Sequence, residues 1–401
     1  MSAGTEAATA GRVLEHLRGR REEMVELLRR LAEIESPTDA PETQARVQEV
    51  LADRLRAAGF RTRRIPGRST GGHLFARPEG RGCPFQLLLG HSDTVWPLGT
   101  LAEMPVEREE GRLRGPGVFD MKAGLVQMVH ALEAVRTLNL EPAVAPAVLV
   151  NSDEEIGSPE SERWVRRLAR RAERALVLEP ALGPAGRLKT ARKGTGHFEI
   201  EIVGRGSHAG LDPGEGASAI QELSHVIQTL HGLTDAEAGV SVNVGEISGG
   251  VRPNVVAPRA RAVVDVRVPD RDRARELENA IRSLEARTPG TRLEVRGSMG
   301  REPMERTDRN RRLWERARRL GELLEMELEE GTSGGASDAN LTSRFTATLD
   351  GLGPVGGGAH AEHEFVEIAE LPARTALLVL LLTLPPAGGD AAEGRQGTGD
   401  A

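Results

Sequence analysis

The chain has 401 residues, more than one hydrophobic core comfortably organises, so two domains are expected. Its formal net charge of −7 comes from acidic and basic residues mixed along the sequence, and no basic stripe predicts binding to nucleic acid. A single cysteine, Cys83, excludes an internal disulfide framework and predicts a reducing, cytoplasmic location.

The sequence contains no segment that predicts a membrane span or a cleaved leader. The N-terminus lacks the apolar stretch of a signal peptide. The longest apolar run, Ala376 to Leu382, is far shorter than the ~20 residues that a membrane helix needs, and it predicts a buried helix. Residues 1–10 and 387–401 are small and polar, so we expect both ends to be disordered.

The first half of the chain predicts an α/β fold. Helices are expected at 12–34, 42–58, 123–138 and 158–171, and strands at 60–66, 73–78, 84–90, 146–150 and 175–178. The strand at 84–90 is almost uniformly apolar, as a strand buried on both faces should be. The alternation of strands and helices predicts a mixed, mostly parallel sheet with helices on both faces.

A different pattern begins near Gly194. Strands are expected at 196–203, 240–247, 259–268 and 291–297, and helices at 215–231 and 270–286. This βαββαβ order predicts a small, ferredoxin-like α+β unit with a four-stranded antiparallel sheet. A helix at 308–325, a strand near 325–330 and a closing helix at 370–384 follow. We therefore expect a catalytic domain in two parts, residues 11–193 and 299–386, interrupted by an inserted domain at 194–298.

Five candidate metal ligands lie in separate short motifs, each where a strand or loop ends: His91, Asp120, Glu155, Glu179 and His360. Sheets of the predicted kind bind ligands beyond the carboxyl ends of their strands, so three of these segments should converge. The set is too rich in oxygen for a structural zinc site and too rich in histidine for calcium. It suits two zinc ions about 3.5–4 Å apart that share one carboxylate, which predicts a hydrolase.

Two further acidic residues suit roles beside these ligands. Asp93 lies two residues after His91 in an extended segment, so it can accept the N–H of that imidazole and fix its tautomer. Glu154 is adjacent to Glu155, so one carboxylate can bind metal while the other transfers a proton.

Each motif also has an ordinary explanation when it is taken alone. Asp120 precedes a helix and could be its N-cap. The acidic residues 153–155 could form a solvated loop, and Glu179 could pair with an arginine. His363 could replace His360 as the ligand, although we favour His360.

In combination, the motifs resemble the zinc metallopeptidases of the glutamate carboxypeptidase, acetylornithine deacetylase, succinyl-diaminopimelate desuccinylase and aminoacylase family, most closely the carboxypeptidase G type. The resemblance runs from IESPT at residues 34–38 to the final helix, with all five ligand motifs in family order. It implies two zinc ions per chain, with cobalt as an alternative, and a cis peptide after Asp120. By the resemblance, Asp120 bridges the two ions. His91 and Glu179 complete one metal site, and Glu155 and His360 complete the other. Glu154 is the general base, and Asp93 orients His91. His360 is assigned because it precedes the acidic–aromatic pair Glu364-Phe365.

The inserted domain is similar to the lid and dimerisation domain of this family. In GRGSHAG, His208 matches a histidine that reaches the site of the partner subunit and stabilises the oxyanion. Asn254 and Arg267 match positions that contact the substrate. Arg301 corresponds to a carboxylate-binding arginine, although Glu302 follows it where the family pattern differs.

Lysine is rare in this chain, since only three of the 53 lysines and arginines are lysines: Lys122, Lys189 and Lys193. Each is a candidate for a role that a guanidinium cannot fill, and Lys193 is included among the substrate-binding candidates.

These features predict a dizinc amidohydrolase that cleaves an amide next to a free C-terminal carboxylate, such as a C-terminal glutamate. Its substrate would be a small peptide or an N-acyl amino acid, and its partner a second copy of the chain. An N-acyl-amino-acid deacylase on the same scaffold is the nearest alternative. A non-catalytic relative kept as a binding module and a structural zinc protein are more remote, the latter because cysteine ligands are lacking.

Overall fold

The computed structural model describes residues 3–80 and 84–386, so Cys83 and the tail at 387–401 lie outside the described residues. The described chain forms two compact units. Unit 1 comprises the residues up to Thr190, Arg306–Gly331 and the residues from Ser337 onward; unit 2 comprises Ala191–Glu305 and Thr332–Ala336.

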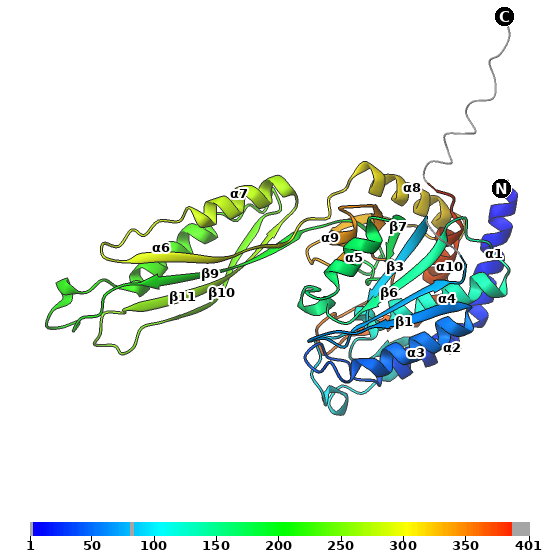
Figure 1. The fold of residues 1–401 in the computed structure, drawn as a ribbon, viewed down its shortest axis with the longest axis horizontal. Coiled ribbons are helices and arrows are strands. Elements are labelled where there is room, and N and C mark those ends of the chain that lie inside the picture. The colour runs from blue at the N-terminus through cyan, green and yellow to red at the C-terminus, as the bar shows by residue number, and fades with distance from the viewer. Residues whose placement is uncertain (1–2, 81–83, 387–401) are drawn as a thin grey trace, which may run out of the picture. The chain divides into compact units, whose positions relative to one another are not determined.

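Unit 1 is built on a six-stranded sheet with the strand order β1-β2-β6-β3-β7-β14 (Figure 1). The strands are β1 Phe60–Ile65, β2 His73–Pro78, β3 Phe85–His91, β6 Ala145–Asn151, β7 Ala172–Val177 and β14 Ala347–Leu349. Strands β6, β3, β7 and β14 run parallel, whereas β1 and β2 are antiparallel to their neighbours. The predicted mixed, mostly parallel sheet is confirmed.

Alternate side chains of the central strand are buried on opposite faces of the sheet. Leu88 of β3 is in register with Val148 of β6 and Leu176 of β7, and all three belong to the main hydrophobic core. Leu87 and Leu89 point the other way and are also fully buried. Both faces are therefore covered, which explains why β3 is almost uniformly apolar.

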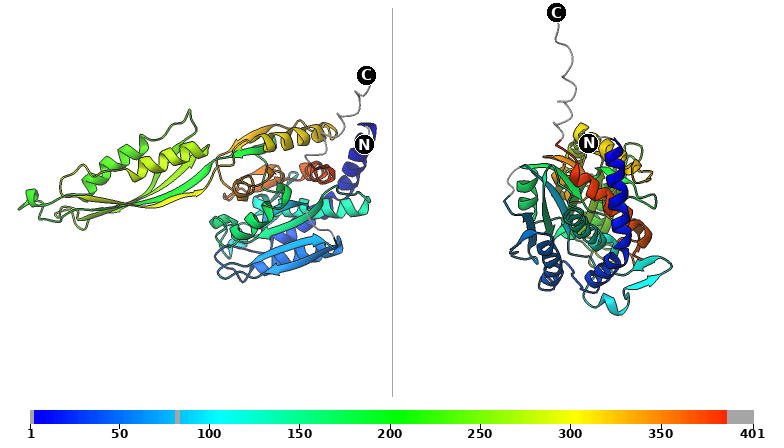
Figure 2. Two further views of the ribbon diagram at one scale, coloured as in Figure 1. Left: turned by 45° about the horizontal axis from the view of Figure 1, so that its top comes forward. Right: turned by 90° about the vertical axis from the view of Figure 1, so that its right-hand side faces the viewer.

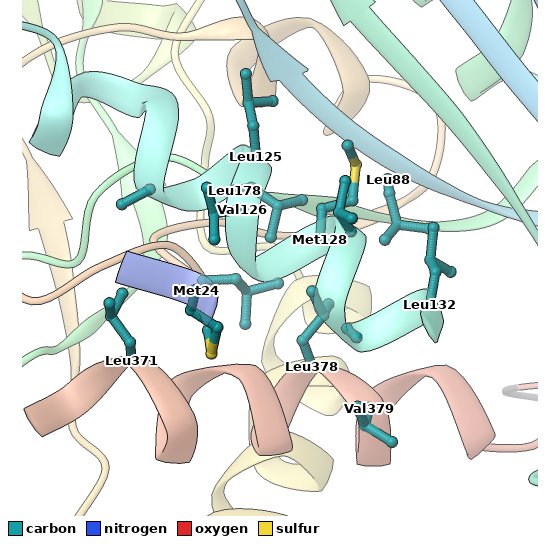
Figure 3. Packing of buried hydrophobic residues seen from close by; sticks show 14 of the residues in the cluster. Met24, Leu88, Leu125, Val126, Met128, Leu132, Leu178, Leu371, Leu378 and Val379 are labelled. Carbon is teal, nitrogen blue, oxygen red and sulfur yellow. The ribbon is translucent and has the colours of Figure 1, made fainter. Parts of the chain in front are cut away.

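Helices from distant parts of the chain cover these two faces. Helix α4 (Ala123–Thr137) packs between the sheet and α10 (Leu371–Thr383), and Met24 of α2 joins the same cluster (Figure 3). Helices α5 (Glu162–Ala169) and α9 (Asp338–Thr342) contact β7 on the second face, and α8 (Asp308–Glu322) contacts β14. Helix α10 is buried, as predicted for its apolar run. No helix formed by the described residues is both long and apolar enough to cross a membrane.

The N-terminal segment differs from the prediction. Residues 3–10 are not disordered but form the start of α1 (Ala3–Gly19), a segment rich in alanine, the strongest helix former. The single helix predicted at 12–34 is two helices, α1 and α2 (Arg21–Ala32), because the chain turns at Arg20 (φ −103°, ψ 6°) directly after a glycine. Helix α3 (Gln44–Ala57) lies where it was predicted.

The remaining differences concern short elements. Six short strands were not predicted, since periodicity is hard to detect over two to five residues: β4 Glu107–Glu109, β5 Arg112–Arg114, β8 Leu188–Arg192, β14 Ala347–Leu349, β15 Gly356–Gly357 and β16 Phe365–Glu367. The strand predicted near 325–330 is β13, Glu330–Ser333. The helix predicted at 158–171 begins only at Glu162, because Ser158 has a positive φ of 60° and a proline follows it.

Unit 2 has the predicted βαββαβ order. Its elements are β9 Gly194–Val203, α6 Ala219–His231, β10 Ser241–Gly249, β11 Arg259–Val268, α7 Arg271–Arg282 and β12 Arg292–Arg301. The four strands form an antiparallel sheet in the order β10-β11-β9-β12. Both helices lie on one face (Figure 2), where apolar side chains of sheet and helices form a separate core. The other face carries ion pairs such as Arg261 with Glu199 at 2.8 Å.

Two helical glycines should respond in opposite ways to alanine. A Cβ at Gly124 in α4 would lie 2.0 Å from the carbonyl oxygen of Leu178, whereas a Cβ at Gly11 in α1 would meet nothing within 4 Å. We expect Gly124→Ala to lower the thermal unfolding midpoint, and Gly11→Ala to raise the free energy of unfolding by about 0.5–1 kcal/mol through helix propensity. The midpoint is followed by tryptophan fluorescence, because all three tryptophans lie in unit 1: Trp96, Trp164 and Trp314. Shifts of the same sign in both variants would contradict this packing.

Candidate active site and metal centre

Strand register brings three ligand-bearing segments to one edge of the central sheet. His91 is the last residue of β3 and is in register with Asn151, the last residue of β6. A short turn, Glu154–Ile156, begins three residues after the end of β6. On the other side of β3, the N–H of Leu178 donates to the carbonyl of Leu89 at 2.9 Å, and Glu179 comes next. The ends of parallel strands therefore place these side chains around one point.

Asp120 enters from an irregular turn, Val118–Lys122, that precedes α4. Its backbone (φ −112°, ψ 97°) is not helical, and the N-cap position of α4 is Lys122. The alternative that Asp120 caps this helix is therefore wrong. The cis peptide expected between Asp120 and Met121 is confirmed. Because Gly124 has no side chain, the first turn of α4 can approach the backbone at Leu178, next to Glu179.

His360 lies in the loop between β15 and β16, and its backbone is left-handed with a φ of 59°. Two residues earlier, Gly358 has a φ of 75°, and a Cβ there would lie 2.9 Å from the Cα of Glu364. The glycine run thus permits a tight loop that no larger residue could form at that position. The side chain of His360 is half exposed. His363 is exposed and belongs to none of the candidate ligand groups among the described residues.

The five candidate ligands form two groups that share Asp120. Oδ1 of Asp120 lies 3.2 Å from Nε2 of His91, and Oδ2 lies 3.6 Å from Nε2 of His360. A second carboxylate accompanies each imidazole: Glu179 Oε1 at 3.5 Å from His91, and Glu155 Oε2 at 3.2 Å from His360. Each half of the site therefore has one imidazole, one carboxylate of its own and one oxygen of Asp120.

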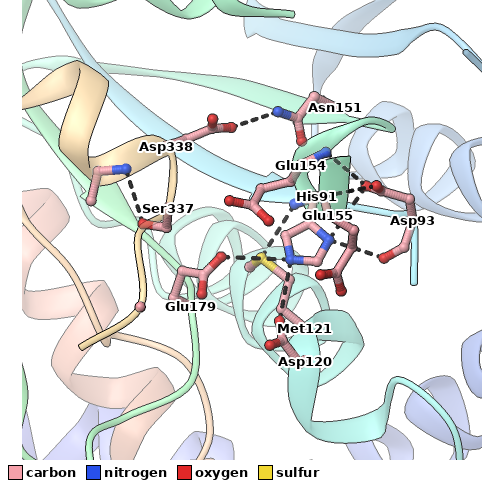
Figure 4. A network of polar contacts seen from close by, with 12 residues as sticks. His91, Asp93, Asp120, Met121, Asn151, Glu154, Glu155, Glu179, Ser337 and Asp338 are labelled. Carbon is pink, nitrogen blue, oxygen red and sulfur yellow. Dashed lines mark hydrogen bonds and ion pairs between the residues drawn. The ribbon is translucent and has the colours of Figure 1, made fainter. Parts of the chain in front are cut away.

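The adjacent residues Glu154 and Glu155 point to different halves of the site. Figure 4 shows the carboxylate of Glu154 on the side of Glu179, with Glu155 on the opposite side of the His91 ring. Ligand atoms of Glu154, His91 and Glu179 lie within 4.8 Å of one another, as do those of Glu155, His91 and Asp120. The turn can therefore supply a ligand to one half and a second carboxylate to the other.

Asp93 is buried and holds the turn that carries both glutamates. Its Oδ1 accepts the backbone N–H of Glu154 at 3.3 Å, and its Oδ2 accepts that of Glu155 at 3.1 Å and the hydroxyl of Thr38 at 2.9 Å. Nδ1 of His91 lies 3.0 Å from the backbone oxygen of Asp93 and 3.4 Å from its Oδ1. Donation from Nδ1 leaves the lone pair of Nε2 facing Asp120, which is the tautomer that a metal ligand requires.

The electrostatics of the site favour cations. Burial alone would lower the pKa of His91, yet the carboxylates of Asp120, Asp93 and Glu179 raise this pKa well above its ordinary value. The hydrogen bond to Glu155 raises the pKa of His360 to about 9. Burial in turn raises the pKa of Glu155. The carboxylates thus draw protons onto both imidazoles, and metal cations would compete with those protons.

The spacing and chemistry of the donors fit two divalent ions. In tetrahedral coordination with metal–ligand bonds of about 2.0–2.1 Å, neighbouring ligand atoms lie about 3.3 Å apart. The ligand atoms around each imidazole are 3.2 to 3.6 Å apart. Two imidazoles and three carboxylates suit zinc or a neighbouring transition metal better than calcium.

A third group of possible metal ligands lacks the uncompensated negative charge of these two groups. Glu23, His130 and Glu133 lie together in unit 1, but Arg54 pairs with Glu23 at 2.8 Å and with Glu133 at 2.7 Å. An arginine therefore already offsets the negative charge of this group.

Within unit 2, the structure brings His208 and Asn254 together. The N–H of Ala209 donates to the carbonyl of Asn254 at 3.0 Å, and His208 is bridged to Val255. His208 is exposed, and its Nδ1 accepts the N–H groups of Gly210 and Leu211, both at 3.1 Å. Its Nε2 must then carry the proton and can donate a hydrogen bond.

The two arginines predicted to bind substrate also lie close together in unit 2. Arg267 of β11 and Arg301 of β12 are both in register with Thr195 of β9, so they occupy one row across three strands. Arg267 makes two hydrogen bonds to Asp265, at 2.8 and 3.1 Å. Lys193 directly precedes β9, near this end of the sheet.

Sequence reasoning missed residues that hold the ligands without being ligands. Glu364, noted only as part of a motif, accepts N–H groups from the turn around Asp120. Asn151 and Asp338 are joined by a buried hydrogen bond of 2.5 Å behind the acidic turn (Figure 4). Asn151 could have been noticed, because it is a polar residue at the end of an apolar strand. The hydrogen bonds of Glu364 could not be predicted, because its partners lie far from it in the sequence.

Comparisons with known proteins find a matching peptidase family, similar sequences and a similar fold. The sequence profile described as peptidase family M20/M25/M40 matches residues 87–384. The chain is 27% identical to carboxypeptidase G2 from a Pseudomonas strain, over 90% of this chain and 88% of that protein. It is 28% identical to a succinyl-diaminopimelate desuccinylase from Stenotrophomonas maltophilia, over 85% and 93% of the two chains. An aminopeptidase from Bacillus cereus has a similar fold, with a TM-score of 0.77 at 20% identity over 90% and 98% of the two chains.

The shared position of Asp120 predicts unequal effects on metal content. Asp120→Asn should leave neither ion tightly bound, because its oxygens face both imidazoles, whereas Glu179→Gln and Glu155→Gln should each release one ion. The number of metal ions bound per chain is measured by elemental mass spectrometry after gel filtration. Glu162→Gln, which changes only an exposed ion pair with Arg166, is the control and should retain the full content. Full metal content in Asp120→Asn would contradict the bridging position.

Proposed function

Because the chain belongs to peptidase family M20/M25/M40 and is a hydrolytic enzyme, we propose that it is a dizinc carboxypeptidase of the glutamate carboxypeptidase type. It would cleave an amide bond next to a free C-terminal carboxylate, with glutamate or a similar residue as the released amino acid. The observation that carries this proposal is the pair of imidazole–carboxylate groups that share Asp120, with Glu154 beside one of them.

We assign His91, Asp120 and Glu179 to one ion and Glu155, Asp120 and His360 to the other. When bound, two zinc ions would supply Lewis acidity toward the scissile carbonyl and lower the pKa of water, and cobalt could supply the same chemistry. Glu154 is not needed as a ligand in this assignment. Its carboxylate takes a proton from the attacking water and delivers it to the nitrogen of the departing amine.

Unit 2 supplies the groups that we assign to substrate recognition. The Nε2–H of His208 is available as a donor to the oxyanion that develops during attack. The row formed by Arg267 and Arg301 suits a carboxylate, because a guanidinium has five N–H groups and Arg267 donates two of them to Asp265. Asn254 and Lys193 are the further candidates for contacts with the substrate.

The second candidate function is removal of an acyl group from an N-acyl amino acid. It would use the same catalytic residues and differ in which side of the amide is recognised. The similarity to a desuccinylase over 85% of the chain favours it. A non-catalytic role has no such support, because neither a candidate ligand nor Glu154 is missing.

Hydrolysis of a defined substrate panel tests the proposal. We expect turnover of N-acyl and peptidyl substrates with C-terminal glutamate, its loss when that α-carboxylate is amidated, and slower turnover of N-acetyl and N-succinyl derivatives of other amino acids. Glu154→Gln should lower kcat by about 10²–10⁴-fold while both metal ions stay bound, because proton transfer is lost. A chelator should abolish turnover, and added zinc should restore it.

Glu162→Gln, at the first residue of α5 after the turn with Glu154, serves as the matched control and should keep full activity. Full activity of Glu154→Gln with intact metal would overturn the mechanism. Faster turnover of N-acetyl amino acids than of glutamyl substrates would select the deacylase.

We further propose that two copies of the chain associate through unit 2. Strand β10 is an edge strand that pairs only with β11 within its sheet, so its outer backbone groups can pair with another strand. Apolar side chains are exposed on and around it: Ile247 at 65%, Val251 at 69% and Ile220 at 47%. In such a dimer, His208 would act in the site of the partner subunit.

Light scattering coupled to gel filtration should therefore give a dimer, and Ile247→Lys should give a monomer. Leu98→Lys, at an exposed apolar residue of unit 1, should remain a dimer. Mixing inactive His208→Ala with inactive Glu154→Gln should restore part of the activity, because each mixed dimer contains one complete site. A fully active monomer, or no recovery on mixing, would refute the shared site.

A further inference from the structure

Glu364 is a carboxylate that is fully shielded from solvent and surrounded by N–H donors. Its Oε1 accepts the backbone N–H groups of Phe119 at 2.8 Å and Asp120 at 3.0 Å. Its Oε2 accepts the backbone N–H of Gly117 and the indole N–H of Trp96, both at 2.9 Å. The four lone-pair sites of the carboxylate are thereby used.

Three of these four donors belong to the turn that carries Asp120. The turn is not helical at Asp120, so its N–H groups lack the partners that a regular helix would provide. A buried N–H group without an acceptor is destabilising. Glu364 therefore takes the place of secondary structure and fixes the direction in which the side chain of Asp120 leaves the backbone.

The backbone of Glu364 anchors the loop that carries His360. Its N–H donates to the carbonyl of Ala361 at 2.9 Å, and its carbonyl accepts the N–H of Gly115 at 3.3 Å. Trp96, the fourth donor to its carboxylate, lies in the loop that follows His91 and Asp93. One residue is thus in contact with segments from three ligand-bearing regions of the chain.

We propose that Glu364 is a positioning residue that sets the separation of Asp120 and His360 and thereby the affinity of the site for its metal ions. This inference rests on the proposed metallopeptidase function. Glu364 does not contact a reacting atom, so it acts only through the ligands that it holds. Glutamine has the same shape but cannot replace it, because one of its two polar atoms is an NH₂ group that would face N–H donors.

Metal affinity of Glu364→Gln, measured by competition with a chromophoric chelator, tests the proposal. We expect affinity for zinc to fall by about 10–100-fold, as is usual when a residue that orients metal ligands is lost. The visible spectrum of the cobalt-loaded variant should also differ from that of the wild type, because the ligand geometry changes. Glu367→Gln is the matched control: it lies in β16, the strand that directly follows Glu364, and pairs with Arg112 at 2.8 Å. It should leave both affinity and spectrum unchanged.

Trp96→Phe removes one donor to Glu364 and retains the three backbone donors, so it tests the same idea if Glu364→Gln fails to fold. It should weaken zinc binding several-fold and shift the cobalt spectrum in the same direction. If the wild type binds two ions and both variants match it in affinity and spectrum, the role of Glu364 is refuted while the proposed function stands. A wild-type protein that binds no metal would overturn the proposed function and this inference together.

Discussion

Four carboxylates, those of Asp120, Glu154, Glu155 and Glu179, are held at one edge of the sheet, and their mutual repulsion governs how this site is built. The raised pKa values of His91 and His360 have the same origin in this concentration of negative charge, because the cluster stabilises positive charge on any group nearby. Burial strengthens the effect by removing the water that would otherwise screen these charges. The same repulsion that destabilises the metal-free fold locally is what gives the site its attraction for divalent cations.

Two other buried carboxylates in the same region have a different environment. Asp93 and Glu364 each accept several N–H donors, which stabilise their charge without a metal ion, while burial still raises the pKa of Glu364 to about 7. Both accept backbone N–H groups from turns that carry ligands. Hydrogen bonds from backbone N–H groups are thus the feature that these two supporting carboxylates share, and Asp93 in addition lies 3.4 Å from Nδ1 of His91.

The fold and much of the site followed from local patterns. The apolar run of β3 and the strand–helix alternation predicted the sheet, and the strand-end positions of His91, Glu155 and Glu179 predicted that they meet. Asp120 and His360 were candidates from their motifs, but neither follows a strand of the central sheet, so strand-end geometry did not predict that they join the other three. The choice of His360 over His363 rested on the resemblance to a family. The support given by Glu364 could not be foreseen, since its partners at Trp96 and Gly117 are separated from it by most of the chain. The break between α1 and α2 depends on one glycine, which periodicity alone does not resolve.

The interruption of unit 1 by unit 2 has a consequence for synthesis on the ribosome. The segments with His91, Asp120, Glu155 and Glu179 emerge first, and unit 2 follows with a sheet and core of its own that can form as the chain is extended. Strand β14, which completes the edge of the central sheet beside β7, and the loop with His360 emerge only afterwards. On the proposed assignment, a nascent chain has the ligands of the His91 side long before those of the His360 side are complete, and the second ion could be bound only after the loop with His360 has emerged.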